Sequence, residues 1–402
     1  MNTREILAHY VQTEKVKTVL HWLDQPKRHA HISGIAGSFK SFLVSAALIE
    51  LKRPIVYIAS NPVDARYVFQ DIHNILGKSL AMYLPSSFSK SFQPETPSNN
   101  AIQERSEILL QLKKLDKPMV LVSSVEAIAE KVIGQDNLDK NQFEINVGEI
   151  LDFDFMMEML NTYGFIREDF VYEPGQYSTR GGIIDIFSYS HELPIRVELD
   201  GRMVESIRQF DAITQLSTAD LKFSSIVPNI QDDEIAGERI SIFEYFNNET
   251  IFFGDQLNTC FATLKSHVTP EIEDLFDTDD FFKKQLTKRS GAEFGQIPHF
   301  RNIEKLSFDQ TPQKTFGKNF SLLIDHLQDN ARLGIGQHIF SETGKQIERL
   351  ETIFQDIGAS IKFNPVYLGL SNGFLDKEHH LAIYTEHEIF GRHYQFKNKH
   401  KY

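Results

Sequence analysis

The sequence is short of cysteine, of basic residues and of long apolar runs, and each shortage excludes a class of protein. Its single cysteine, Cys260, cannot support an intramolecular disulfide or a multi-cysteine zinc site. Lys and Arg number 42 against 55 Asp and Glu, a net charge of −13, which excludes a surface that is basic throughout. A local basic groove is still compatible with this balance.

No run of about 18 apolar residues occurs, so we expect no membrane-spanning helix. Met1–Glu5 opens a polar stretch without an apolar h-region, so we also expect no signal peptide and a soluble, cytoplasmic protein. At about 150 residues per domain, a chain of 402 residues predicts roughly two to four domains.

The first 125 residues alternate between short apolar strands and helical patterns, which predicts βαβ units and a parallel sheet. The strand candidates are His29–Ile35, Pro54–Ala59, Leu80–Leu84 and Pro118–Val122. The helical patterns are Phe39–Leu51, Pro62–Leu76 and Ala101–Leu115. Ser86–Asn100 is rich in Ser, Pro and Asn and is expected to be a surface loop.

From about Ile150 the pattern becomes that of an antiparallel unit. Pro194–Leu199 alternates strictly, with its apolar residues on one face and Arg196 and Glu198 on the other. Asp200-Gly201, a dipeptide typical of type I′ hairpin turns, follows. We therefore expect a sheet with one buried face, and we expect Arg196 and Glu198 to face solvent or a partner.

The last part of the chain is predicted to be a small separate α/β unit. Helices are expected at Asn319–Asn330 and Lys345–Gly358, and strands at His338–Ser341 and Leu381–Thr385. The tail Gln395–Tyr402 lacks a closing element, which suggests a fragment of a longer chain.

A damaged phosphate-binding loop lies between the first strand and the first helix. In the pattern G-x-x-x-x-G-K-[ST], glycines let backbone N–H groups wrap the phosphates, while the Lys and the hydroxyl hold phosphate and magnesium. Gly34, Lys40 and Ser41 fit, but Phe39 replaces the second glycine. The alternative reading is that Gly34 and Gly37 only turn the strand into the helix and that Lys40 is a surface lysine.

A second ATPase motif is also damaged. An apolar strand should end in Asp-Glu, with the Asp holding magnesium and the Glu polarising the attacking water. The best candidate is Thr250–Gln256, where Asp255 can hold magnesium but Gln256 replaces the general base. Two defects in one site predict that this chain does not hydrolyse ATP.

The remaining candidates for chemistry favour structural roles. His379, His380, His387 and His393 fit no standard zinc spacing, so we expect surface histidines and no metal. Cys260 has no partner pattern for a nucleophile and is expected to be a small buried hydrophobe.

Several segments resemble a known family. Arg167–Phe187, which includes EPGQYSTRGGIIDIF, and Pro194–Asp211 resemble the UvrA-binding domain shared by the excision-repair protein UvrB and the bacterial transcription-repair coupling factors (the Mfd family). Asn372–Phe374 and Leu381–Gly391 resemble the third domain of the coupling factors, which UvrB lacks. The short Ser86–Asn100 loop has no room for the DNA-gripping β-hairpin of UvrB.

The resemblance implies an α/β multidomain fold. Residues 1–125 and 213–304 would form a degenerate RecA/UvrB-like parallel domain. Residues 126–212 would form an inserted antiparallel α+β UvrA-binding domain, and residues 305–402 a small α/β third domain.

The resemblance also implies a role. The family proteins are ATP-driven double-stranded DNA translocases that dislodge stalled RNA polymerase and recruit UvrA. This chain would be a catalytically inert recruiter, with ATP and Mg used only by motor domains outside it. The alternatives are a UvrB-like ATPase or helicase with Lys40, Ser41 and Asp255 at its site, and a DNA-binding module.

The resemblance points to Arg180 and Arg196 as the residues that meet acidic groups of UvrA, with Glu198 and Leu199 beside them. An arginine fork suits carboxylates. The alternatives are a cross-strand salt bridge for Arg196 and a turn-holding role for Arg180. Family members often have an aromatic residue where this sequence has Asp200, and Leu199 would partly replace the contact that this aromatic residue makes.

Overall fold

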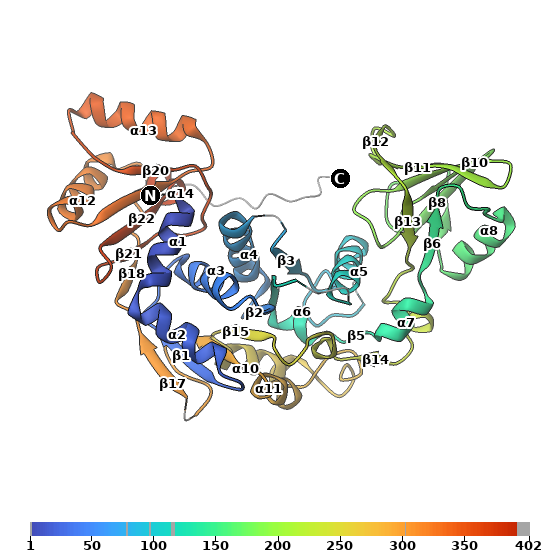
Figure 1. Ribbon diagram of the computed structural model, residues 1–402, viewed down its shortest axis with the longest axis horizontal. Coiled ribbons are helices and arrows are strands. Elements are labelled where there is room, and N and C mark those ends of the chain that lie inside the picture. The colour runs from blue at the N-terminus through green and yellow to red at the C-terminus, as the bar shows by residue number, and fades with distance from the viewer. Residues whose placement is uncertain (1, 78, 96–97, 114–116, 302, 392–402) are drawn as a thin grey trace.

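The computed structural model describes residues 2–77, 79–95, 98–113, 117–301 and 303–391. A parallel α/β domain lies in the middle, an antiparallel unit at one end and a small α/β unit at the other (Figure 1). The fold is therefore α/β and multidomain, as predicted. The tail Gln395–Tyr402 and His393 lie outside the described residues.

The central domain is built on a seven-stranded parallel sheet. Its strands, in spatial order, are β17 (Glu304–Ser307), β1 (His29–Ser33), β16 (Gly291–Phe294), β15 (Ile251–Asp255), β2 (Ile55–Ala59), β4 (Val120–Ser124) and β3 (Ala81–Leu84). Its helices are α1 (Thr3–Gln12), α2 (Glu14–Asp24), α3 (Phe39–Leu51), α4 (Pro62–Leu76), α5 (Asn99–Lys113), α10 (Leu257–His267) and α11 (Asp279–Thr287). Every residue of β2, β4, β15 and β16 is buried, as expected for parallel strands covered on both faces.

The order of the central strands brings distant parts of the chain together. β15 and β16, which follow the antiparallel unit in sequence, lie between β1 and β2. β17 pairs with β1 at the edge, with Ile32 opposite Leu306. Strand ends from both parts of the chain therefore meet beside the loop that follows β1.

The antiparallel unit has a six-stranded sheet with one buried face and one partly solvent-exposed face, here called the wet face, on which Arg196 and Glu198 are partly exposed and Asp185 is buried. Its strands, in order, are β12 (Ser217–Leu221), β11 (Met203–Phe210), β10 (Ile195–Asp200), β9 (Ile183–Ile186), β8 (Gln176–Arg180) and β7 (Ile166–Arg167). Ile184 and Val197 face each other on the inner side, where α8 (Phe153–Thr162) contributes the buried Met156 and Leu160 to the same core. The predicted alternation and hairpin are confirmed. The turn is not of type I′, because the loop residues are Gly201 and Arg202 and only Gly201 has a positive φ. The sheet continues past residue 212.

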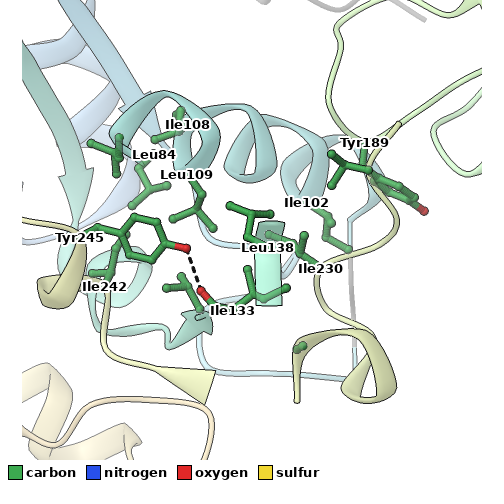
Figure 2. Close-up of a cluster of buried hydrophobic side chains, with 14 of the residues drawn as sticks. Leu84, Ile102, Ile108, Leu109, Ile133, Leu138, Tyr189, Ile230, Ile242 and Tyr245 are labelled. Atoms are coloured by element: carbon green, nitrogen blue, oxygen red, sulfur yellow. Dashed lines mark hydrogen bonds between the residues drawn. The ribbon is translucent and has the colours of Figure 1, made fainter. Parts of the chain in front are cut away.

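Short elements join this unit to the central domain. They are α6 (Val125–Ala129), β5 (Val132–Ile133), α7 (Gln135–Lys140), β6 (Phe143–Asn146), β13 (Phe223–Ile226), α9 (Asp233–Ala236), β14 (Arg239–Ile240) and the 3₁₀ helix η1 (Ile242–Tyr245). Figure 2 shows their core: Leu109 of α5 packs in one cluster with Ile133 and with Ile230, and the Tyr245 hydroxyl donates to the Ile133 carbonyl at 2.8 Å. The apolar core therefore runs from the central domain into the antiparallel unit.

A buried arginine holds the same junction. Arg105 of α5 donates to the carbonyls of Pro85 and Ala127 at 2.8 Å and to that of Glu130 at 3.2 Å. The Glu130 carboxylate lies 3.5 Å from the Arg105 guanidinium and accepts from the side chain of Gln231 at 2.9 Å. Gln231 lies in the segment that leads from β13 back to the central domain, so this network connects that segment to the central domain.

The C-terminal unit has a five-stranded mixed sheet. Its strands, in order, are β18 (Gln310–Pro312), β21 (Phe374–Asp376), β22 (Leu381–Thr385), β19 (Gly336–Phe340) and β20 (Asn364–Val366), and its helices are α12 (Phe320–Arg332), α13 (Gly344–Ile357) and α14 (Glu386–Phe390). Leu323, Leu350 and Tyr384 belong to its own core. Phe374 and Ile383 instead belong to the core of the central domain, so the two units pack firmly together.

Within the described ranges, no helix has both the length and the apolar character needed to cross a membrane.

Candidate functional site

Arg180 and Arg196 meet on the wet face of the antiparallel sheet. Arg196 places Nε and one terminal nitrogen at 2.7 and 2.9 Å from the two carboxylate oxygens of Asp185, a bidentate pair. Arg180 donates to the same carboxylate at 2.8 Å. The three residues come from β10, β9 and β8, and the register places Arg196 directly opposite Asp185. The Asp185 side chain is fully buried beneath the two guanidinium groups.

Each of these guanidinium groups also lies on an aromatic ring. Arg180 lies 4.7 Å from the centre of the Phe170 ring, and Arg196 lies 4.7 Å from that of Phe210. Hydrogen bonds to Asp185 raise the pKa of Arg196, so it is charged at any physiological pH. The Arg180 side chain is 45% exposed and that of Arg196 is 19% exposed. Arg180 is therefore the more accessible cation, and Arg196 the better anchored one.

Glu198 has a cross-strand partner that the sequence analysis missed. It accepts from Arg208 and, at 2.8 Å, from the Ser206 hydroxyl, both on β11. Arg208 lies opposite Arg196 in the register, so it faces the same side of the sheet. Alternation along β11 with a two-residue period was the signal that could have identified it.

Leu199 does not join the arginine face. The register between β10 and β11 shifts between Glu198 and Leu199, and Leu199 packs against the buried apolar cluster of the inner side. The extra residue of this bulge is Glu205 on β11, so Leu199 keeps the alternation of β10 and shares the inner face with Ile195 and Val197. Asp200, at the end of β10, is exposed.

Two exposed aromatic residues on this face were also missed. Phe170 and Tyr172 are 42% and 52% exposed, and their ring centres lie 6.5 Å apart. They precede the EPGQYSTR motif in a segment without strand or helix periodicity, so only the clustering of aromatics there could have indicated them. Exposed aromatics beside arginines are typical of protein-binding surfaces.

The loop after β1 brings the predicted phosphate-site residues together. Gly34 and Gly37 have φ angles of +67° and +53°, which glycine adopts readily. Lys40 Nζ lies 2.5 Å from Asp255 Oδ2 at the end of β15. The Tyr57 hydroxyl donates to the same carboxylate oxygen at 3.0 Å, and burial followed by the Asp255 charge raises the pKa of Tyr57. The carboxylate therefore neutralises the lysine.

Phe39, which replaces a loop glycine, is fully buried. Its ring centre lies 4.9 Å from those of Tyr10 and Phe308 and 5.7 Å from that of Phe374. Ser41 is also buried, and its hydroxyl lies 3.5 Å from Asp71 of α4. Both side chains are therefore packed inside the protein.

Cys260 and His379 have structural contacts, whereas His380 is exposed as predicted. Cys260 is fully buried, its thiol donates to the Asp255 carbonyl at 3.3 Å, and burial raises its pKa. His379 lies 3.0 Å from the carboxylate of Asp376. Among the described residues, no group of three His, Cys, Asp or Glu side chains is arranged to hold a metal ion.

Comparison with known proteins identifies the antiparallel unit. Residues 143–231 match the family model of the UvrB interaction domain, so the arginine face lies on a domain of that class. The match extends past residue 212, as the sheet does.

The longer matches are to DNA-repair proteins. The chain is 29% identical over 217 residues to the transcription-repair-coupling factor of Bacillus subtilis and 27% identical over 201 residues to that of Myxococcus xanthus. It is 28% identical over 218 residues to UvrABC system protein B of Escherichia coli. These alignments cover 54%, 48% and 50% of this chain, but only 18%, 17% and 32% of the respective relatives. The chain thus carries a region similar to transcription-repair-coupling factors, and the predicted resemblance is confirmed.

Proposed function

We propose that this chain is the UvrA-recruiting module of a transcription-repair coupling protein and that it does not hydrolyse ATP. The observation that carries the proposal is the pair Arg180 and Arg196, held on one buried carboxylate at the wet face of a UvrB interaction domain. In this proposal the antiparallel unit is an insertion in the central domain. RNA polymerase, double-stranded DNA, ATP and Mg are partners and cofactors of further domains in a longer protein.

The geometry suits recognition of an acidic partner. Asp185 fixes both guanidinium groups, so little side-chain entropy is lost when a partner carboxylate binds their outward N–H groups. Phe170 and Tyr172 add exposed aromatic area beside Arg180. The face therefore combines oriented cations with an apolar contact. Phe170 and Tyr172 supply this contact in place of the aromatic residue that family members often carry where this chain has Asp200.

Calorimetric titration of the full chain into UvrA tests this role. We expect saturable binding that Arg180→Glu weakens at least about tenfold, or about 1.4 kcal/mol, because the reversal sets a carboxylate against acidic groups of the partner. Arg332→Glu, an exposed arginine paired with Asp329 in the C-terminal unit, should leave the affinity unchanged. Equal affinities for the wild type and Arg180→Glu would place the contact elsewhere, and absence of wild-type binding would refute the recruiter role.

The alternative function, a UvrB-like ATPase, is favoured only by the contact between Lys40 and Asp255. In our proposal this ion pair is structural, because Asp255 neutralises Lys40, Gln256 replaces the base and Phe39 fills the loop.

Thermal melting with ATP and Mg distinguishes the two functions. A ligand at 100 times its dissociation constant adds about 2.7 kcal/mol to the stability of the native state. We expect no rise in melting temperature and no phosphate release. A rise that Lys40→Ala abolishes would instead establish the ATPase alternative.

A further inference from the structure

Two backbone N–H groups of the loop after β1, those of Ala36 and Ser38, donate to acceptors in the C-terminal unit. The Ser38 N–H donates to the carbonyl of Asn372 at 3.1 Å. The Ala36 N–H donates to the side-chain carbonyl of Gln310 at 3.2 Å. In a phosphate-binding loop, N–H groups at these places point at phosphate oxygens.

The contact is reciprocal. The Asn372 N–H donates to the Ser38 hydroxyl at 3.1 Å, and the Gln310 N–H donates to the Gly34 carbonyl at 3.0 Å. Ser38 and Gln310 are both buried. The loop therefore both donates hydrogen bonds to the C-terminal unit and accepts them from it. These bonds lie away from water, where hydrogen bonds are strongest.

Close backbone approach explains why the two glycines of the loop are needed. A Cβ on Gly37 would lie 2.3 Å from the carbonyl oxygen of Gly373, and a Cβ on Gly34 would lie 1.9 Å from that of Phe308. Glycines in phosphate loops let the backbone approach a phosphate closely. Here they let it approach another stretch of the same chain.

A buried carboxylate strengthens the contact. Asp71 of α4 accepts from both the backbone N–H and the hydroxyl of Ser371 at 2.7 Å. Burial raises the pKa of Asp71 to about 6, although hydrogen bonds from Ser38 and Ser371 and the nearby charge of Lys40 oppose the shift. At neutral pH the group is therefore mainly the anion, which is the stronger acceptor.

The residues on either side of Ser371–Gly373 also contact the central domain. Asn74 of α4 donates to the Gly369 carbonyl at 2.8 Å. The Tyr10 hydroxyl donates to Asp376 at 3.2 Å, and Lys15 pairs with Glu378 at 2.5 Å.

We propose that the phosphate loop Gly34–Ser41 is a docking site for a peptide, and that its ligand is the chain's own segment Ser371–Gly373. The Asn372 carbonyl accepts the loop N–H that would otherwise meet a phosphate oxygen. A polyphosphate and the C-terminal unit therefore require the same N–H groups and exclude each other. The loop fixes the C-terminal unit to the central domain, a role independent of UvrA binding.

Hydrogen exchange read by mass spectrometry on the full chain tests the docking. Gly37→Ala drives a Cβ into the Gly373 carbonyl, so we expect exchange of the peptides that contain Ser38 and Asn372 to accelerate at least tenfold. Gly317→Ala is the matched control, because Gly317 has nearly the same φ, +56°, with open space around its Cβ position. That control should retain wild-type protection at both peptides. Wild-type protection in Gly37→Ala would overturn the docking.

A second pair of variants covers the case in which Gly37→Ala unfolds as a whole. Asp71→Ala removes both acceptors of Ser371, and we expect faster exchange around Asn372 while β22 stays protected. Asp71→Asn keeps one carbonyl oxygen for the Ser371 N–H and should largely restore protection. Equal protection in all three proteins would overturn the proposal.

Two phosphate probes test the exclusion. Inorganic tripolyphosphate and ATP with Mg should leave the exchange of the Ser38 and Asn372 peptides unchanged in the wild type. If either probe protects the Ser38 peptide or exposes the Asn372 peptide, the loop is open to phosphate and the proposal is overturned. UvrA affinity is expected to be the same in Gly37→Ala and the wild type, so the recruiter role and the docking can fail separately.

Discussion

Restoring the consensus glycine of the phosphate loop, Phe39→Gly, is expected to destabilise the protein by about 4 kcal/mol and not to create a nucleotide site. Phe39 is fully buried among three aromatic rings, and truncating such a side chain costs about 3–5 kcal/mol. The loop N–H groups would still be bound to Gln310 and Asn372. Urea unfolding followed by circular dichroism measures the loss of stability.

Two variants act as controls for this effect. Ile49→Gly changes an exposed residue of the same helix and should cost only about 1 kcal/mol, the helix propensity of glycine. Phe39→Leu keeps most of the apolar volume and should fall between the two. If Phe39→Gly gained a rise in melting temperature with ATP and Mg, the loop would have kept its nucleotide function and the ring alone would have blocked it.

The second large effect is expected at the junction between the central domain and the antiparallel unit. Arg105→Met keeps the length of the side chain but leaves the carbonyls of Pro85 and Ala127 without this donor and the carboxylate of Glu130 without its cation. Unpaired buried polar groups and a broken buried ion pair together predict a loss of about 4 kcal/mol. Chemical unfolding with a fluorescence readout measures it.

Lys113→Met is the matched control for Arg105→Met. Lys113 lies on the same helix and pairs with Asp139, but the Asp139 side chain is largely exposed. Solvent screens such a pair, so the loss should stay below about 1 kcal/mol. Similar stabilities for Arg105→Met and Lys113→Met would show that the buried carbonyls find other partners.

The sequence alone determined the features that depend on neighbouring residues. The strict alternation of Pro194–Leu199 and the turn dipeptide after it specify a strand and a hairpin, because side chains alternate with a period of two. The same period assigned Arg196 and Glu198 to the wet face. The defects at Phe39 and Gln256 and the long motif Glu173–Phe187 are likewise visible in the sequence.

Only the tertiary structure decided which of these residues meet. The strand register brought Arg180 and Arg196 onto Asp185. Phe170 supplies the aromatic contact at the arginine face. Ser38 of the phosphate loop donates to the carbonyl of Asn372, which lies more than 300 residues further along the chain. Such pairings depend on long-range register and on how whole units pack, and no local periodicity encodes either of these.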